Sequence, residues 1–396
     1  MDYLIVLADS AEDGELQVPS QILTRMLVIA GQVAVRQLVH LDTHVYAELR
    51  RRSRVREEQE NSSKQKGSSA ASGRRPSAAT GRPSSEDAVD DDDLVGAVAD
   101  DEELEMVKRI CETEIVTGGR SLLSLLAPLV VSINSNPVKY ADPALRAAAS
   151  LCLAEFMLIS ASFCAQHLQL LFTVLDRSPE EVIRSNLVIA IGDFNSRFPN
   201  LIEPWTPHLY GRLRDTSAFV KRTTLNVLSH LILSDRVKVK GQISDIALCI
   251  IDDDQRIAGM ARMFFSEFAR KSNNHLYNVM PDIISRLCDP SAELDEQNFH
   301  TILKWIMALI QKEKQCESLV EKIILRLGAS RTERQSRDLM FCLSLLSFNE
   351  RSLRRVIEHW SCISDKLHET VVSETLTTIL ANTKKMAKQV CWIGTD

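Results

Sequence analysis

Two histidines, His40 and His44, are the first residues whose types and spacing could do chemistry. Four residues apart on a helix, they would share one face, as the zinc ligands of a helix-borne metalloprotease do. That chemistry also needs a glutamate directly after the first histidine, and Leu41 stands there instead. We therefore expect both histidines to be ordinary helix residues.

Other patterns that would indicate catalysis or cofactor binding are missing. Asp252, Asp253 and Asp254 could suggest a calcium loop, but the glycine and the distal glutamate of such a loop do not follow. The sequence has neither a GxxxxGK[ST] phosphate loop nor a GxGxxG fingerprint. We expect no enzyme activity, no cofactor, no metal site and no small-molecule substrate. We expect the three aspartates to form a polar turn at the start of a helix.

Basic residues gather at two places along the middle of the chain, and they are the candidate site. The first group is Arg212, Arg214, Lys221 and Arg222, and the second is Arg236, Lys238 and Lys240. If the turns that carry them fall on one edge of the molecule, the two groups form a single ridge that could neutralise phosphates of double-stranded DNA without reading its sequence. The alternative is that these cations pair with turn aspartates of neighbouring elements, which Arg214 and Arg222 fit well.

The elements that must position these residues are helices. Aspartates that open a polar turn recur at intervals of 34, 39, 37 and 37 residues, each followed by an apolar stripe at helical spacing. The aspartates are Asp142, Asp176, Asp215, Asp252 and Asp289. A helix pair with one apolar face must stack on its neighbours, so this period predicts an all-α fold, a HEAT-repeat α-solenoid.

The stretch 176–241 shows the pattern in most detail. Ser178 precedes Pro179, and Glu181 follows three residues after the serine, which is typical of a capped helix start. Ser178 before a proline is also a candidate phosphosite. The capping role is a sufficient explanation of this serine, and both readings stay open.

We expect three parts. Residues 1–49 are predicted to form two helices of incomplete HEAT repeats, with the second starting around His40, residues 50–103 a disordered linker, and residues 104–390 the solenoid. The linker is first basic and then acidic, with eleven Asp and Glu between residues 86 and 105. Removing those charges changes a net charge of −6 to +5 for the rest of the chain. Ser77 and Ser84 follow arginines there and are candidate phosphosites, unless the segment is simply a solvated linker.

The nine cysteines are scattered, with no CxxC pair, and most stand in apolar helix context. They therefore predict reduced core thiols of an intracellular protein. We found no apolar run of 18 residues free of charge and no signal peptide, so we expect no membrane partner.

The middle of the chain resembles a known family. The strings RSNLVIAIGDFNSRFPNLIEPWTPHLYGRLRD and LSHLILSDRVKVKGQISDIALCIIDDDQRIAGMARMFFSEFA are similar to the HEAT region of condensin subunit 1, the D2-type subunit of condensin I. The similarity continues through FHTILKWIM and SRTERQSRDL and covers roughly residues 104–365. The segment 203–207, EPWTP, looks more like the condensin I version than the condensin II paralogue.

The resemblance implies a non-catalytic, architectural subunit of a chromosome-organising complex. Its partners would be a kleisin subunit, an SMC ATPase pair and double-stranded DNA or chromatin, and its location the nucleus and mitotic chromosomes, with a cytoplasmic pool. Family members are longer at the N-terminus, so the chain is expected to correspond to a C-terminal portion. A generic HEAT adaptor for peptide partners and the condensin II counterpart stay open as alternatives.

Overall fold

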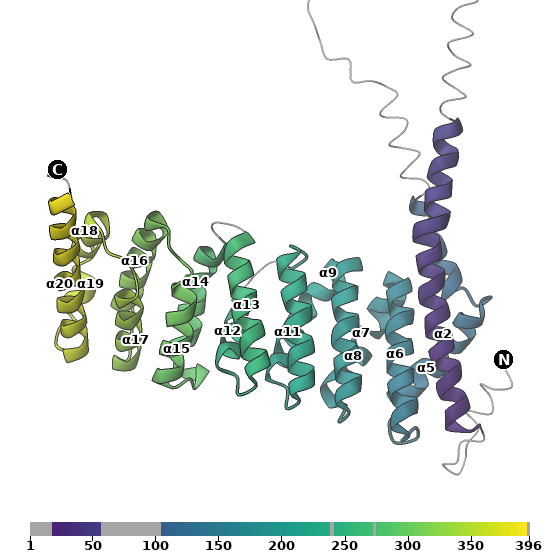
Figure 1. Cartoon of the computed structure of the whole chain (residues 1–396). Helices are drawn as coiled ribbons and strands as arrows, with labels where there is room; N and C mark the ends of the chain where they lie inside the picture. The colour runs from purple at the N-terminus through teal and green to yellow at the C-terminus, as the bar shows by residue number, and fades with distance from the viewer. Residues whose placement is uncertain (1–17, 57–103, 238–240, 272–274, 394–396) are drawn as a thin grey trace, which may run out of the picture. The chain divides into compact units, whose positions relative to one another are not determined.

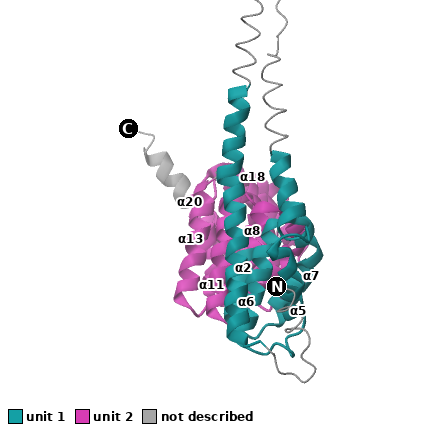
Figure 2. Ribbon diagram, turned by 90° about the vertical axis from the view of Figure 1, so that its right-hand side faces the viewer, with its two compact units in different colours: residues 1–190 teal, residues 191–396 magenta. Residues whose placement is uncertain are grey.

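The computed structural model describes residues 18–56, 104–237, 241–271 and 275–393, apart from the side chains of residues 385–393. These residues are helical, with no strand among them. The chain divides into two compact units, residues 1–190 and 191–396, and the boundary falls within one helix, α8 (Glu181–Arg197). Figure 2 colours the two units separately. The expected linker beyond residue 56 and the expected phosphosites Ser77 and Ser84 lie outside the described residues.

Unit 1 is built from antiparallel helices, which Figure 1 shows in purple and blue. Its elements are α2 (Ser20–His40), the π-helical turn η1 (Leu41–Val45), a second π-helical turn η2 (Cys111–Ile115), α5 (Leu122–Ser135), α6 (Pro143–Ile159), α7 (Ala161–Arg177) and the start of α8. Each helix of a pair buries its apolar face against its partner, as a solenoid requires.

Unit 2 continues the same pattern with further helix pairs. Its elements are α9 (Pro199–Ile202), η3 (Glu203–Trp205), α10 (Thr206–Gly211), η4 (Arg212–Arg214), α11 (Ala218–Leu233), α12 (Ile243–Leu248), η5 (Cys249–Ile251), α13 (Gln255–Lys271), α14 (His275–Leu287), η6 (Pro290–Ala292), α15 (Glu296–Met307), α16 (Glu313–Gly328), α17 (Glu333–Ser344), α18 (Glu350–Glu358), α19 (Ser361–Ser364) and α20 (Thr370–Ile393). The all-α HEAT-repeat fold predicted from the sequence is confirmed.

Turn aspartates start the second helix of several pairs, as their period predicts. Asp142 caps α6, with its side chain accepting a hydrogen bond from the backbone nitrogen of Ala144 at 3.0 Å and Pro143 in the first helical position. Asp252 accepts from the nitrogen of Asp254 at 2.9 Å, and Asp254 accepts from the nitrogen of Arg256 at 2.8 Å. The predicted polar turn at residues 252–254 is therefore present at the start of α13.

The first helical segment differs from the sequence prediction. Two helices divided near His40 were expected, but one helix runs over Ser20–Arg56 and continues through η1. A π-helical turn accommodates one extra residue without ending a helix, and His40 and Tyr46 on either side of it keep helical backbone angles. The helix also extends seven residues, 50–56, into the segment that was expected to start the linker at residue 50.

Helix α2 packs closely along α6 through small residues. A Cβ atom on Gly31 would lie 3.4 Å from the Cα atom of Cys152 and 1.7 Å from the Glu155 carboxylate, so glycine permits this approach. The amide of Gln32 donates to Glu155 at 2.7 Å.

By length and composition alone, the helix Ser20–Arg56 could cross a membrane, with a third of its most apolar window buried in the protein. Its packing on α6 identifies it as a helix of the repeat stack.

Candidate functional site

The first basic group surrounds the start of α11, and the structure pairs its cations with carboxylates. Arg214 contacts Asp245 at 2.8 Å and Lys221 contacts Asp252 at 2.5 Å. Arg212 lies 3.6 Å from Asp215. This end of α11 therefore holds the ladder of turn ion pairs that was the alternative to a DNA-binding ridge.

The ion pairs engage three of the four cations. The carboxylates in contact are Asp215, Asp245 and Asp252. Arg222, the fourth cation, donates from Nε to the backbone oxygen of Ala218 at 3.3 Å. Because three of these cations already contact carboxylates, this surface offers little attraction to phosphates.

The second basic group lies at the other end of α11. Arg236 follows the last turn of the helix, is exposed, and donates from Nη1 to the backbone oxygen of Ser196 at 3.3 Å. Lys238 and Lys240 lie outside the described residues. The same end carries Lys271, paired with Asp235 at 2.5 Å, and Arg270, paired with Glu267 at 3.1 Å.

The described cations of the two groups lie at opposite ends of α11, so the condition for a single ridge, that both turns share one edge, is not met. Helix α11 spans Ala218–Leu233, and 16 residues at 1.5 Å per residue separate its ends by about 24 Å. A helix reverses the edge on which successive turns lie. The turn before α11 and the turn after it are thus on opposite edges of the repeats.

Sequence reasoning missed Arg270 and Lys271 as neighbours of the second group. They lie 34 and 35 residues beyond Arg236, close to one repeat period, at the end of α13. The contact between Lys271 and Asp235 brings the two helix ends together. The repeat period could have predicted this neighbourhood. Residues one period apart at helix ends should lie close together, as those at helix starts do.

Ser178 is buried, with 5% of its surface exposed, and its hydroxyl donates to the Glu180 carboxylate at 2.8 Å. Helix α8 begins at Glu181, and the backbone oxygen of Glu180 accepts from the nitrogen of Arg184, so the helix starts later than the predicted serine cap implies. A kinase needs access to the hydroxyl. The burial of Ser178 in the folded chain argues against the phosphosite prediction.

An apolar surface lies on α2 in unit 1, where the sequence predicted exposed apolar residues of incomplete repeats. Ile29 is 63% exposed and Val33 41% exposed. Both line a groove of about 700 Å³ together with Ile110 and Ile115 from the segment that leads into α5. Exposed apolar surface of this kind is typical of a place where another chain element packs.

Most of the cysteines lie in the core, as their apolar sequence context predicts. Of the cysteines whose side chains the structure describes, eight are free, and all of these except Cys362 are buried. Burial raises the pKa of Cys152, Cys164 and Cys249 to about 12, which makes these thiols poor nucleophiles at neutral pH.

His40 and His44 are exposed on the helix around η1, with ring centroids 5.4 Å apart, and no third described ligand joins them.

Comparison with known proteins identifies the family. A family model described as non-SMC mitotic condensation complex subunit 1 matches residues 182–344. Condensin complex subunit 1 of Xenopus laevis is 48% identical over 377 residues, which is 95% of this chain and 27% of the relative. The chain belongs to the condensin subunit 1 family. It spans about a quarter of the length of that relative.

Two relatives from one organism separate the condensin I and condensin II versions. The condensin-1 subunit CAP-D2 of Arabidopsis thaliana is 40% identical over 74% of this chain and 21% of the relative. The condensin-2 subunit CAP-D3 of the same plant is 29% identical over 41% of this chain and 12% of the relative. The greater identity and coverage agree with the condensin I character of residues 203–207.

Proposed function

We propose that this chain is a non-catalytic, architectural part of condensin I that binds the kleisin subunit and contributes contacts to double-stranded DNA. The observation that carries the proposal is the 48% identity to condensin complex subunit 1 over almost the whole chain. A stack of helix pairs supports this role, because such a fold offers long surfaces to partners and few enclosed sites for substrates. Association with the SMC ATPase pair would follow through the kleisin.

We infer that DNA contacts the second basic group, which lies at the end of α11. Arg236 is exposed there, Lys238 and Lys240 follow it in sequence, and Arg270 and Lys271 lie at the adjoining end of α13. Among the described cations, Lys271 pairs with Asp235 and Arg270 with Glu267, while Arg236 donates to a backbone oxygen; at the start of α11, by contrast, Arg212, Arg214 and Lys221 each contact a carboxylate. Attraction to phosphates depends on such local charge and not on the net charge of −6.

The location follows from the same proposal. A condensin I subunit acts on chromosomes, so we expect this chain in the nucleus and on mitotic chromosomes, with a cytoplasmic pool when chromosomes are not condensed. Microscopy of a tagged chain through the cell cycle tests it. Exclusion from mitotic chromosomes would contradict the proposal.

Duplex-DNA binding across a salt series tests the DNA contact. The variant Arg236→Glu with Lys238→Glu and Lys240→Glu should bind DNA much more weakly, and its log–log salt dependence should flatten by about 0.9 for each phosphate that the protein no longer neutralises. The matched control is Arg212→Glu with Arg214→Glu, which places the same substitution at the other end of α11. Equal weakening in both variants, or no binding by the unaltered chain, would refute the assignment.

Co-purification tests the kleisin contact independently of DNA. The unaltered chain and the triple variant should both co-purify with the condensin I kleisin after nuclease treatment, because the DNA group is not expected to hold the partner. Recovery of the condensin II kleisin instead would identify the other paralogue. Failure to recover either would leave a generic HEAT adaptor as the better description.

A further inference from the structure

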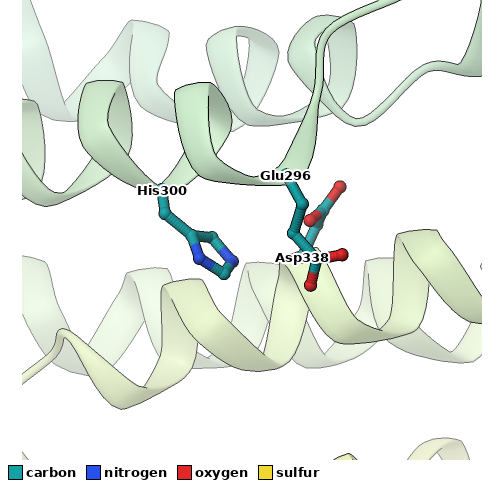
Figure 3. A group of neighbouring side chains, drawn as sticks. All are labelled: Glu296, His300 and Asp338. Carbon is teal, nitrogen blue, oxygen red and sulfur yellow. The ribbon is translucent and has the colours of Figure 1, made fainter.

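Three side chains from two consecutive repeats converge in unit 2, well away from the basic groups. Figure 3 shows Glu296 and His300 projecting from α15 toward Asp338 on α17. Glu296 and His300 are four residues apart and so lie on one helix face. One ligand atom from each of the three side chains lies within 4.8 Å of the other two. Within the described residues, this is the one group of His, Cys, Asp or Glu that converges closely enough to hold a metal ion.

Two atoms of this group are buried without a hydrogen-bond partner. They are Nε2 of His300 and Oδ1 of Asp338, and the Asp338 side chain as a whole is 2% exposed. A buried polar atom left without a partner costs about 1–3 kcal/mol, so native proteins rarely keep two of them side by side. Oδ1 of an ionised Asp338 offers an electron pair, and so does Nε2 of His300 in the neutral tautomer that carries its proton on Nδ1.

The neighbouring side chains hold the three groups in place and leave these atoms free. The His300 ring stacks on Phe341, with centroids 3.6 Å apart, which fixes the direction of the ring nitrogens. Arg334 donates from Nε to Oδ2 of Asp338 at 2.9 Å and from Nη2 to the backbone oxygen of Leu294 at 3.1 Å. The Asp338 carboxylate is therefore oriented through one oxygen only.

Arg337 acts in the same way on Glu296, with its Nη2 atom 3.4 Å from Oε2. Metal-binding carboxylates commonly accept hydrogen bonds of this kind from an outer shell of residues. The arginines also neutralise the two carboxylates. The cation must therefore gain its affinity from direct bonds to nitrogen and oxygen, and a histidine in the set favours zinc over calcium or magnesium, which prefer oxygen ligands alone.

We propose that Glu296, His300 and Asp338 form a zinc site that joins α15 to α17. Zinc bonds to nitrogen and oxygen are about 2.0–2.2 Å long, so the side chains would close around the ion by small rotations, and a water molecule would complete a tetrahedral set. The bound ion would be a partner for Nε2 of His300 and Oδ1 of Asp338, the two buried atoms that have no hydrogen bond. It would also add a link between two consecutive repeats, beside the Arg337–Glu296 pair and the Arg334–Leu294 hydrogen bond.

Zinc titration of the full chain, first stripped with a chelator, tests the site. We expect one zinc ion per chain and a rise in melting temperature with zinc chloride that calcium and magnesium chlorides do not produce. His300→Gln should weaken zinc binding by more than the ~10- to 100-fold that removal of an outer-shell partner costs. His359→Gln, which alters another partly exposed histidine beside a carboxylate, Glu321, is the matched control and should bind zinc normally.

Two further measurements test whether zinc binds to other ligands and whether a variant has lost its fold. Cys288 and Cys342 are buried near Asp338, so cobalt(II) in place of zinc should show no thiolate charge-transfer band if the ligands are those proposed. Glu296→Gln serves as a second ligand variant in case His300→Gln does not fold. The proposal is wrong if the chain binds no zinc, or if His300→Gln and Glu296→Gln bind it as the unaltered chain does.

Discussion

The Nζ atom of Lys221 lies 2.5 Å from Oδ2 of Asp252, and this ion pair connects the second helix of one repeat to the turn of the next. Both side chains are largely buried, with exposed fractions of 21% and 13%. Arg146 and Glu180 make the same kind of connection within unit 1, at 3.0 Å. The ladder of turn ion pairs is thus a structural feature of this chain.

Lys221→Met should lower the free energy of unfolding by about 1–3 kcal/mol, because it leaves a partly buried carboxylate without its cation. Denaturant unfolding of the single variants, of Asp252→Asn and of the double variant would measure the coupling between the two residues. Arg270→Met, which removes a cation whose side chain is 78% exposed, is the control and should change stability by less than about 0.5 kcal/mol. Equal effects of Lys221→Met and Arg270→Met would contradict the burial argument.

Glu112 makes stability depend on pH. Burial by itself would raise the pKa of this carboxyl, but hydrogen bonds from Ser160, Ala161 and Ser162 outweigh it and lower the pKa below 4.5. A carboxyl whose pKa is lowered on folding contributes stability above its unfolded pKa and loses it as the pH falls through the folded value. Glu112→Gln should therefore cost about 1–2 kcal/mol at pH 7 and much less below pH 4.

Urea unfolding at several pH values measures this difference. The exposed neighbour Glu114 provides the matched control, since Glu114→Gln removes the same charge outside the network. A Glu112 variant whose stability deficit did not shrink on acidification would show that the carboxylate does not cap α7.

Gly192 marks a close approach of α8 to α11 within unit 2. A Cβ atom there would lie 2.7 Å from Cγ1 of Val227, closer than packed atoms tolerate. Gly192→Ala should therefore destabilise the chain by about 1 kcal/mol, although alanine favours a helix by a similar amount. In a Val227→Ala background the same substitution should become stabilising. Melting temperatures of the four variants test this reversal of sign, and its absence would exclude steric contact as the cause.

Helix α2 offers a direct comparison of its two faces. Leu27 is completely buried against the repeats, whereas Ile29 is 63% exposed. Leu27→Ala should cost about 2–5 kcal/mol and Ile29→Ala less than about 0.5 kcal/mol. Denaturant unfolding of the two variants measures this difference. A large drop in stability on Ile29→Ala would mean that the groove is packed in solution.

The fold could be predicted because the sequence patterns that indicate it are local. The turn aspartates and the apolar stripes at helical spacing each depend on neighbours within a few residues, so they could be recognised in one sequence. The position of a turn relative to the next was harder to predict. Arg214 and Arg236 are 22 residues apart, and the sequence left open whether their turns share an edge; the intervening helix places them on opposite edges.

The contacts that were missed all depend on the register between repeats. Glu112 caps a helix that begins 49 residues later, and Glu296 meets Asp338 across 42 residues. No local pattern marks such pairs, because their meeting depends on small rotations between successive helix pairs. Lys271 and Asp235 belong to the same class.

The unbroken helix Ser20–Arg56 has a mechanical consequence. Beyond Leu38 it contributes no buried residue, and from Leu41 to Arg56 it rises by about 24 Å. The N-terminal part of this helix packs on α6, and the part beyond Leu38 projects from the repeats as a rigid extension. Whatever is joined to its tip therefore begins at a distance from the repeats.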